Sequence, residues 1–351
     1  MKALVLQGKN KLAIEDFSMD EPLTPDDVRI QIRDVGVCGS DVHYYLHGRI
    51  GDFVVEKPMV LGHEASGVIL EVGRNVLHLR VGDRVCMEPG IPSPGSASTF
   101  AGCYNLDPGV RFWATPPIHG CMRETVVHPG NFTFKLPDSV SLEEGALVEP
   151  VAIGVYSAST AGVQPGDVAL VFGAGTIGIV TALAALASGC SKVVLVDVKE
   201  KKLEIVRGSF SQNIICVNSS KEPLDDAVRS VAPEGVDVVF EASGSLAVIG
   251  SFIRYLRPNG RAVMIGMPSA PAPFDVVAAQ VKEIKVMHIF RYRNMYPRTI
   301  KMIASGTLKV RPLITHFFDF EDAMKAFDFA AAMPEEAIKI MVRMQHEAPG
   351  R

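Results

Sequence analysis

The sequence contains no run of about 20 apolar residues, the length that a helix needs to cross a membrane. It also lacks a strong charge imbalance. The formal net charge is −4 over 351 residues, which argues against a general nucleic-acid-binding or membrane-binding surface. The first eight residues read as a strand and a turn rather than as a secretory signal. We therefore expect a cytoplasmic protein with no nucleic-acid partner and no membrane partner.

Cysteine is sparse, and the cysteines show no paired spacing. The six residues are scattered and form no Cys-x-x-Cys motif, which favours free thiols in a reducing compartment over a disulfide framework. Hydrophobic residues make up 48% of the chain, a content typical of globular proteins. The length is sufficient for two domains with substantial cores.

The pattern of the sequence changes near residue 150. Earlier residues form short β-rich runs interrupted by glycine and proline, whereas later residues alternate helical segments with apolar strands. Such alternation predicts a doubly wound parallel sheet. A closing strand at residues 337–343 is expected to rejoin the first module. We therefore predict an α/β protein in which residues 1–149 and 291–351 form a β-rich domain and residues 150–290 form an inserted cofactor domain.

The clearest motif is a Gly-x-Gly-x-x-Gly turn between an apolar strand and a helix. Residues 169–178 read Ala-Leu-Val-Phe-Gly-Ala-Gly-Thr-Ile-Gly. The first glycine makes a tight turn, the second clears space for a pyrophosphate and the third lets the helix pack on the strand. An acid follows the next apolar strand, where a ribose-binding carboxylate is expected. The predicted cofactor-binding residues are Gly173, Gly175, Thr176, Ile177, Gly178 and Asp197. The alternative is an ordinary strand–helix turn of an α/β domain.

The acid at this position also selects the cofactor. A carboxylate at Asp197 accepts hydrogen bonds from a free ribose diol and repels a 2′-phosphate. Lys199 lies close enough to weaken that repulsion, but the carboxylate is expected to dominate. The sequence therefore predicts NAD rather than NADP.

Possible metal ligands occur in the first module and at its end. Cys38, the neighbours His63 and Glu64, and Glu149 could supply a thiolate, an imidazole and carboxylates to a zinc ion with an open coordination position. Adjacent residues of a regular strand face opposite ways, so His63 and Glu64 reach one ion only from a turn or a distorted strand. Spacing alone gives only a modest case for this site, and the alternatives are a buried thiol, a core histidine and solvated acids.

Several short motifs carry a family resemblance that covers nearly the whole chain. The glycine turn, Val37-Cys38-Gly39-Ser40-Asp41, Gly62-His63-Glu64, Val148-Glu149-Pro150 and Phe290-Arg291-Tyr292 are similar to those of the zinc-dependent medium-chain dehydrogenases. The polyol group, with sorbitol and xylitol dehydrogenases, is the most similar. The resemblance implies a GroES-like catalytic domain with an inserted Rossmann domain.

The resemblance also implies residue roles. It makes Cys38, His63 and Glu64 ligands of one catalytic zinc ion, and it leaves open whether Glu149 binds the ion directly or holds its water. Ser40 and His43 would form a proton relay, and a water held by Glu149 is the other possible route. Tyr44, Phe112, Arg291 and Tyr292 would line the substrate pocket; core packing and a surface cation are the alternatives for these residues.

One departure from many relatives concerns a second zinc ion. The four cysteines that hold a structural zinc in those relatives would fall at Ser96, Thr99, Gly102 and Val110, and the nearby Cys103 stands alone. Four thiolates cannot be assembled from this stretch, so we predict no structural zinc.

These expectations combine into one function. The resemblance implies reversible, zinc- and NAD-dependent oxidation of a polyol to a 2-ketose, either xylitol to D-xylulose or D-sorbitol to D-fructose. Alternatives are a dehydrogenase of the same fold that acts on butanediol, galactitol or threonine, and a non-catalytic NAD-binding protein. A homo-oligomer is expected, with a tetramer favoured and a dimer possible.

Overall fold

The computed structural model describes residues 1–344, which divide into two compact units. The first unit contains residues 1–149, 296–304 and the described residues from 313 on. The second contains residues 150–295 and 305–312, so residues 291–295 group with the second unit. No helix within residues 1–344 combines the length and the apolar character needed to span a membrane.

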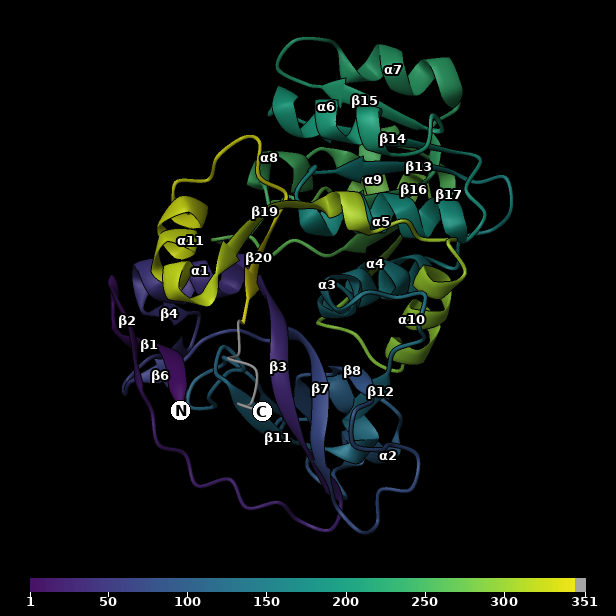
Figure 1. The fold of residues 1–351 in the computed structure, drawn as a ribbon. Helices are drawn as coiled ribbons and strands as arrows, with labels where there is room; N and C mark the ends of the chain where they lie inside the picture. Colours follow the sequence, from purple (N-terminus) through teal and green to yellow (C-terminus); the bar gives the residue numbers. More distant parts are fainter. Residues whose placement is uncertain (345–351) are drawn as a thin grey trace. The chain divides into compact units, whose positions relative to one another are not determined.

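The first unit is built mainly from strands (Figure 1). Its largest sheet has the order β12-β8-β7-β3-β20-β19, and β11 also pairs with β3. The bounds of these strands are β3 (Asp27–Val37), β7 (Glu64–Val72), β8 (Arg84–Met87), β11 (Thr125–Pro129), β12 (Thr133–Lys135), β19 (Ile314–Asp319) and β20 (Lys339–Arg343). The closing strand therefore rejoins the N-terminal module, as the sequence predicted, because β20 pairs antiparallel with β3.

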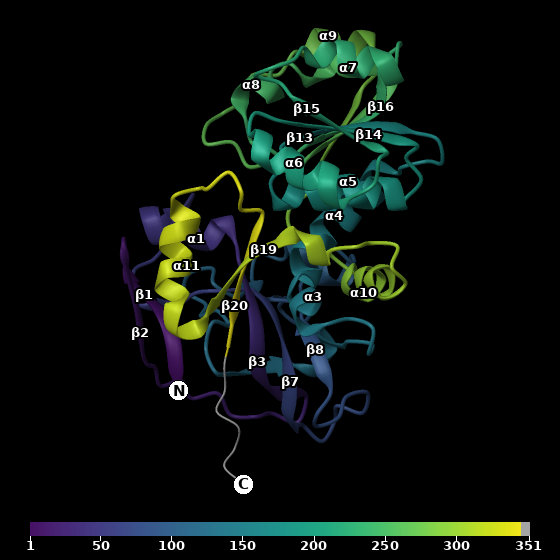
Figure 2. The ribbon, with the colours of Figure 1, turned by 45° about the horizontal axis from the view of Figure 1, so that its top comes forward.

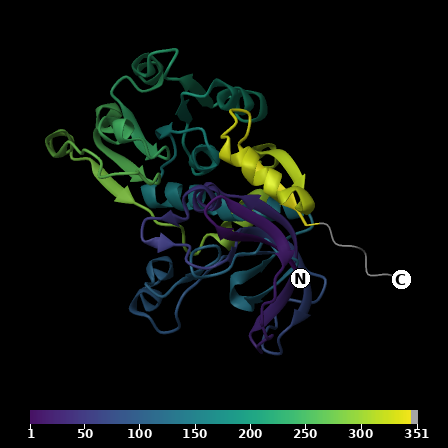
Figure 3. The same ribbon diagram turned by 90° about the vertical axis from the view of Figure 1, so that its left-hand side faces the viewer.

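Smaller elements complete this unit. A second sheet has the order β2-β1-β6, and two short hairpins pair β4 with β5 and β9 with β10. Their bounds are β1 (Lys2–Gly8), β2 (Lys11–Asp16), β4 (Arg49–Ile50), β5 (Phe53–Val54), β6 (Met59–Val60), β9 (Gly90–Ile91) and β10 (Arg111–Phe112). The helices are α1 (Gly39–His47), α2 (Ala97–Phe100), α3 (Leu142–Ala146), α10 (Tyr296–Ala304) and α11 (Ala323–Ala331). The yellow α11 lies beside the purple N-terminal elements (Figure 3).

The core of the first unit joins residues from both ends of the chain. Alternate residues of β3, including Val28, Ile30 and Ile32, are fully buried, the period-two pattern of a strand with one face in the core. They share one apolar cluster with Phe327 of α11 and Val342 of β20. This shared core fixes the C-terminal strand against the N-terminal module. The side chains of that strand are positioned by the same packing.

The second unit is a six-stranded parallel sheet with the order β15-β14-β13-β16-β17-β18 (Figure 2). The strands are β13 (Val168–Phe172), β14 (Lys192–Asp197), β15 (Ile214–Asn218), β16 (Val236–Glu241), β17 (Leu256–Met264) and β18 (Lys285–His288). The helices are α5 (Thr176–Ala187), α6 (Glu200–Ser209), α7 (Leu224–Val231), α8 (Leu246–Ile249) and α9 (Val276–Val281), and α4 (Val148–Ala161) begins at the boundary. The predicted doubly wound α/β architecture is confirmed.

Candidate metal centre and cofactor site

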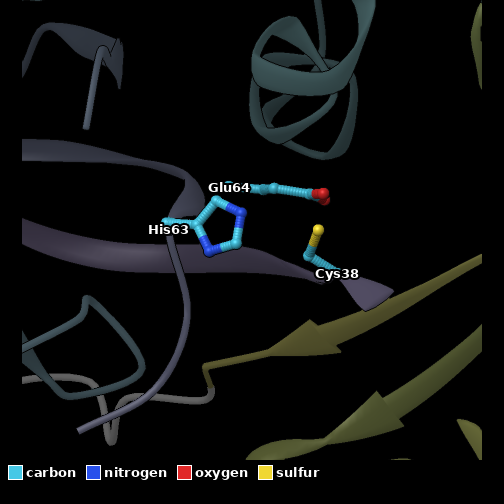
Figure 4. A group of neighbouring side chains, drawn as sticks. All are labelled: Cys38, His63 and Glu64. Carbon is cyan, nitrogen blue, oxygen red and sulfur yellow. The ribbon is translucent and has the colours of Figure 1, made fainter. Parts of the chain in front are cut away.

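Three side chains of the first unit converge on one point (Figure 4). Cys38, His63 and Glu64 each offer one ligand atom, and these atoms all lie within 4.8 Å of one another. Cys38 follows β3, and His63 lies just before β7, of which Glu64 is the first residue. Gly62 turns the chain with φ of +89°, so His63 lies in the segment that leads into the strand and Glu64 at the first position of the strand. The turn thus allows the adjacent side chains of His63 and Glu64 to point toward one ion, as their adjacency in the sequence requires.

A buried carboxylate orients His63. Asp41 is fully buried, and its Oδ2 lies 3.4 Å from His63 Nδ1, while its Oδ1 accepts a hydrogen bond of 3.2 Å from the Gly62 amide. The other ring nitrogen lies on the side of Cys38 and Glu64 (Figure 4). Burial alone would lower the pKa of His63, but the charges of Asp41 and Cys38 raise it. A carboxylate behind the imidazole is a common arrangement at histidine-bound metals.

The Glu64 carboxylate forms an ion pair with Lys339. Both oxygens of Glu64 accept hydrogen bonds from Lys339 Nζ, at 2.8 and 2.7 Å, and this ammonium also donates to the carbonyl of Val37 at 3.1 Å. Both side chains are buried. Burial by itself would lower the pKa of Lys339, but the charges of Glu64 and Cys38 raise it. The Glu64 carboxylate is therefore paired with a buried ammonium group inside the first unit.

Glu149 and Glu88 form a second pair of buried acids in this unit. Glu149 is buried in the first turn of α4, and its charge contributes to the raised pKa of Lys339. Glu88 Oε1 accepts a hydrogen bond of 2.7 Å from the Tyr104 hydroxyl. The pKa of Glu88 is raised to about 7, chiefly by burial and also by the charge of Glu149, against the lowering effect of the Tyr104 hydrogen bond. A carboxyl group with a pKa of about 7 thus interacts electrostatically with Glu149, one of the predicted site residues.

The predicted relay and two of the predicted substrate residues belong to the same unit. Ser40, His43 and Tyr44 lie on α1, directly after Cys38. The His43 ring is exposed, and its Nδ1 lies 2.9 Å from the carbonyl of Arg49. The buried Phe112 places its ring 5.6 Å from that of His63. Along α1, exposure increases from the half-buried Ser40 to the exposed His43.

The other two predicted substrate residues lie in the second unit. Arg291 has a left-handed backbone with φ of +56°, and its guanidinium stacks over the Phe290 ring at 4.9 Å. Tyr292 is buried. The structure thus groups the four predicted substrate residues in two sets, one in each unit.

The glycine turn of the second unit has the shape that a dinucleotide requires. Gly173 adopts φ of +99°, and a Cβ on Gly178 would lie 1.7 Å from the Gly173 carbonyl oxygen. A Cβ on Gly175 would meet nothing within 4 Å, so the space in front of the α5 N-terminus is open to a ligand. Thr176 and Ile177 begin that helix. The predicted turn therefore fits a pyrophosphate.

Asp197 lies at the end of β14, the strand beside β13. One of its oxygens accepts a hydrogen bond of 2.6 Å from the Ala174 amide, inside the glycine turn. The other accepts from the amides of Val198 and Lys199 at 2.7 and 2.9 Å. These bonds fix the carboxylate beside the turn, where a ribose would follow the pyrophosphate.

Comparison with known proteins agrees with this architecture. Residues 24–138 match the alcohol dehydrogenase GroES-like domain, and residues 176–305 match the zinc-binding dehydrogenase domain. The chain is 56% identical to a D-xylulose reductase of Morganella morganii, over 97% of this chain and 99% of that protein. It is 41% identical to a sorbitol dehydrogenase of Rattus norvegicus, over 97% and 95% of the two chains. The crystal structure of a butanediol dehydrogenase from Bacillus subtilis superposes with a TM-score of 0.88 at 30% identity, over 98% and 99% of the chains.

The chain belongs to the zinc-dependent medium-chain dehydrogenases. The family resemblance that the motifs predicted is confirmed, and the likeness is to the group of xylulose reductases and sorbitol dehydrogenases. A sulfur, an imidazole nitrogen and a carboxylate oxygen around one point form a donor set suited to Zn²⁺. In this member of the family, Cys38, His63 and Glu64 form the catalytic-type metal site.

Sequence reasoning missed three residues that support this site. Lys339, Asp41 and Gly36 were not assigned a role, although each lies against a predicted ligand or its partner. One signal for Lys339 was available. A lone lysine opens the otherwise apolar run Ile340-Met341-Val342, and a lysine inside such a strand needs a buried acid. No spacing in the sequence identified that acid as Glu64.

Proposed function

We propose that this protein catalyses the reversible oxidation of a polyol secondary hydroxyl to a 2-ketose with NAD as the acceptor. The convergence of Cys38, His63 and Glu64 on one point carries the proposal. The likeness to a D-xylulose reductase and to sorbitol dehydrogenases supports the polyol class. Xylitol and D-xylulose are the favoured pair, and D-sorbitol and D-fructose are the second.

Cys38, His63 and Glu64 would hold one zinc ion, with Glu149 either as a further ligand or as the acceptor that holds its water. When bound, zinc supplies a Lewis acid that favours the ionised form of the hydroxyl. NAD, when bound, accepts the hydride. The overall reaction converts the alcohol and NAD⁺ to the ketone, NADH and one proton. The chain must bind and orient the polyol and move that proton.

Helix α1 supplies a route for the proton. With a carbonyl oxygen 2.9 Å from its Nδ1, His43 carries the hydrogen on that nitrogen and donates it to Arg49. In the neutral ring, Nε2 is then the nitrogen that can accept a hydrogen bond. Ser40, one turn earlier and half-buried, would hand the proton to the exposed His43, which releases it to solvent.

The substrate would be held by groups of two kinds. Of the predicted substrate residues, Tyr44, Arg291 and Tyr292 have hydrogen-bonding atoms suited to an open-chain polyol, and Phe112 is apolar. A site built to pair hydroxyls discriminates strongly against analogues that lack them, because its buried polar groups are then unpaired. Asp197 would bind the ribose diol of NAD and disfavour the 2′-phosphate of NADP.

The lobe at residues 91–111 would need no structural zinc. Among residues 1–344, the only group of three or more potential ligands that converge is the one at Cys38. Hydrogen bonds organise the lobe: both oxygens of Asp107 accept backbone amides, from Ser93 at 2.5 Å and Gly109 at 3.1 Å. Ser96 caps α2 by accepting the Thr99 amide at 3.1 Å. These bonds support the proposal of one zinc ion per chain.

We also propose a homo-oligomer, with a tetramer favoured over a dimer. Strand β18 ends the sheet of the second unit, so one edge of it has no partner strand within the described chain. Helix α9, the helix before β18, exposes large apolar side chains, with Val277 at 67% and Val281 at 81%. An open strand edge beside exposed apolar residues is a surface that association would cover.

Metal analysis and initial rates test the function together. We expect one zinc per chain, NAD preferred over NADP, and the highest kcat/KM with xylitol in a panel that includes D-sorbitol, galactitol, butanediol and threonine. Cys38→Ala and His63→Ala should abolish turnover and lower zinc content, whereas Cys103→Ala should keep both. A higher kcat/KM for butanediol or threonine would reassign the substrate. NAD binding without turnover of any alcohol would favour a non-catalytic protein.

A further inference from the structure

Lys339 is the least expected group near the metal centre. An ammonium has three N–H donors. Lys339 donates two hydrogen bonds to the oxygens of Glu64 and one to the carbonyl of Val37. Its side chain is only 4% exposed and that of Glu64 only 1%, so water does not compete for either group. The ion pair is therefore a fixed part of the site rather than a surface contact.

The fold holds both members of the pair rigidly. Lys339 begins β20, whose register pairs it with Ile314 of β19, and the next residue pairs with Val37 of β3. Glu64 is paired with Gly36 on β3, on the other side of the same strand. Because Gly36 lacks a Cβ, the carboxylate lies directly against the β3 backbone and within reach of the lysine. Strand pairing therefore fixes the backbone positions of both charged residues.

We propose that Lys339 is a positioning residue that shares the Glu64 carboxylate with the metal ion and so weakens the coordination of that ion by Glu64. An oxygen that already accepts a hydrogen bond from an ammonium donates less charge to a cation on its other side. An ammonium in the interior also repels a divalent cation nearby, since the low dielectric leaves the repulsion poorly screened. This inference rests on the proposed role of Glu64 as a zinc ligand.

A purely structural role would have a different signature. If Lys339 served only to neutralise a buried acid, its loss would leave Glu64 uncompensated and loosen the whole site. Zinc would then leave faster. If Lys339 competes for the carboxylate, its loss frees both oxygens for the ion, and zinc leaves more slowly. The direction of the change in the release rate separates the two roles.

The experiment measures zinc release from the zinc-loaded protein to a chromogenic chelator. We expect Lys339→Gln to slow release at least threefold, and Lys339→Arg, which keeps the cation, to stay within twofold of the parent protein. In a Glu64→Gln background the Lys339→Gln change should have no effect. Lys135→Gln, which removes an exposed lysine paired with Asp83 in the same sheet, is the matched control and should not alter release.

Cobalt substitution gives a second readout that does not depend on turnover. The visible ligand-field bands of the Co²⁺ protein should shift in Lys339→Gln and remain unchanged in Lys135→Gln. Lys339→Met, of similar length and without a polar atom, is the second variant should Lys339→Gln fail to fold, and it should slow release in the same direction.

Three results bear on the inference in different ways. Release at the parent rate or faster in both the Gln and Met variants would overturn it, as would the same slowing in the Glu64→Gln background. If the parent protein itself bound no zinc, the proposed function would fall first, independently of any Lys339 variant.

Discussion

The α-carbon of Gly36 lies directly against the Glu64 carboxylate: a Cβ built on Gly36 would sit 2.1 Å from Glu64 Oε2. The two residues face each other across β3 and β7. The absence of a side chain at one position therefore makes room for a metal ligand at the other. Glycine is needed at this position because the Glu64 carboxylate approaches the backbone closely, and not because the backbone has a positive φ.

A side chain at Gly36 should disrupt the metal centre. Gly36→Ala would force the Glu64 carboxylate off its present position, and we expect zinc affinity to fall at least tenfold, the effect typical of changes in the groups that orient metal ligands. The overpacking should also cost about 1–3 kcal/mol of stability. Zinc titration and urea unfolding measure the two effects. Gly8→Ala, whose Cβ would meet nothing within 4 Å, is the control and should bind zinc normally.

Alanine substitutions at two glycines of the cofactor turn should have different effects, one on the melting temperature and the other on NADH binding. Gly178→Ala places a Cβ against the Gly173 carbonyl, so we expect a lower melting temperature whether or not NAD is present. Gly175→Ala has open space around its Cβ and should keep the parent melting temperature, but it should weaken NADH binding at least tenfold, because the methyl group takes room meant for the phosphates. Thermal unfolding and NADH fluorescence titration distinguish them. Unchanged NADH affinity in Gly175→Ala would contradict the assigned phosphate site.

Removing the charge of Asp197 should alter cofactor choice. Asp197→Asn keeps the size of the side chain but loses the carboxylate, so we expect weaker NAD binding and a smaller preference for NAD over NADP. Dissociation constants for both cofactors measure the ratio. Asp226→Asn, on the exposed side of α7, is the control. An unchanged ratio in Asp197→Asn would show that another group reads the ribose.

Glu88 should make the stability of the zinc-free protein depend on pH. Its pKa is raised from 4.5 to about 7 in the folded state, chiefly by burial. Between these two values the folded protein holds a proton that the unfolded chain has lost, so this contribution to stability falls as the pH rises from 4.5 to 7 and then levels off. A shift of this size corresponds to about 3 kcal/mol.

The test compares urea unfolding at pH 5 and pH 8. Glu88→Gln can still accept a hydrogen bond from Tyr104 but cannot ionise, so it should remove most of that difference in unfolding free energy. Glu71→Gln, an exposed acid paired with Arg29, should leave the difference as it is. If Glu88→Gln and the parent protein lost equal stability between the two pH values, the assigned titration would be wrong.

The sequence by itself determined the class of each unit, the glycine turn and its acid. Those features depend on local rules: the period of apolar residues decides helix or strand, and a turn that must approach a phosphate demands glycine at fixed spacing. Residue types also limited the metal candidates, since few side chains bind zinc. The closing strand at 339–343 was predictable for the same reason, as a short apolar run after a helix.

Only the tertiary structure decided which side chains meet. Cys38 and His63 are 25 positions apart, and Glu64 and Lys339 are separated by 275 positions, so no local pattern links them. They meet because β3 pairs with β7 on one side and with β20 on the other. Strand pairing depends on the burial of whole sheet faces, a property summed over the chain, and the partner of a buried charge is known only when that pairing is known.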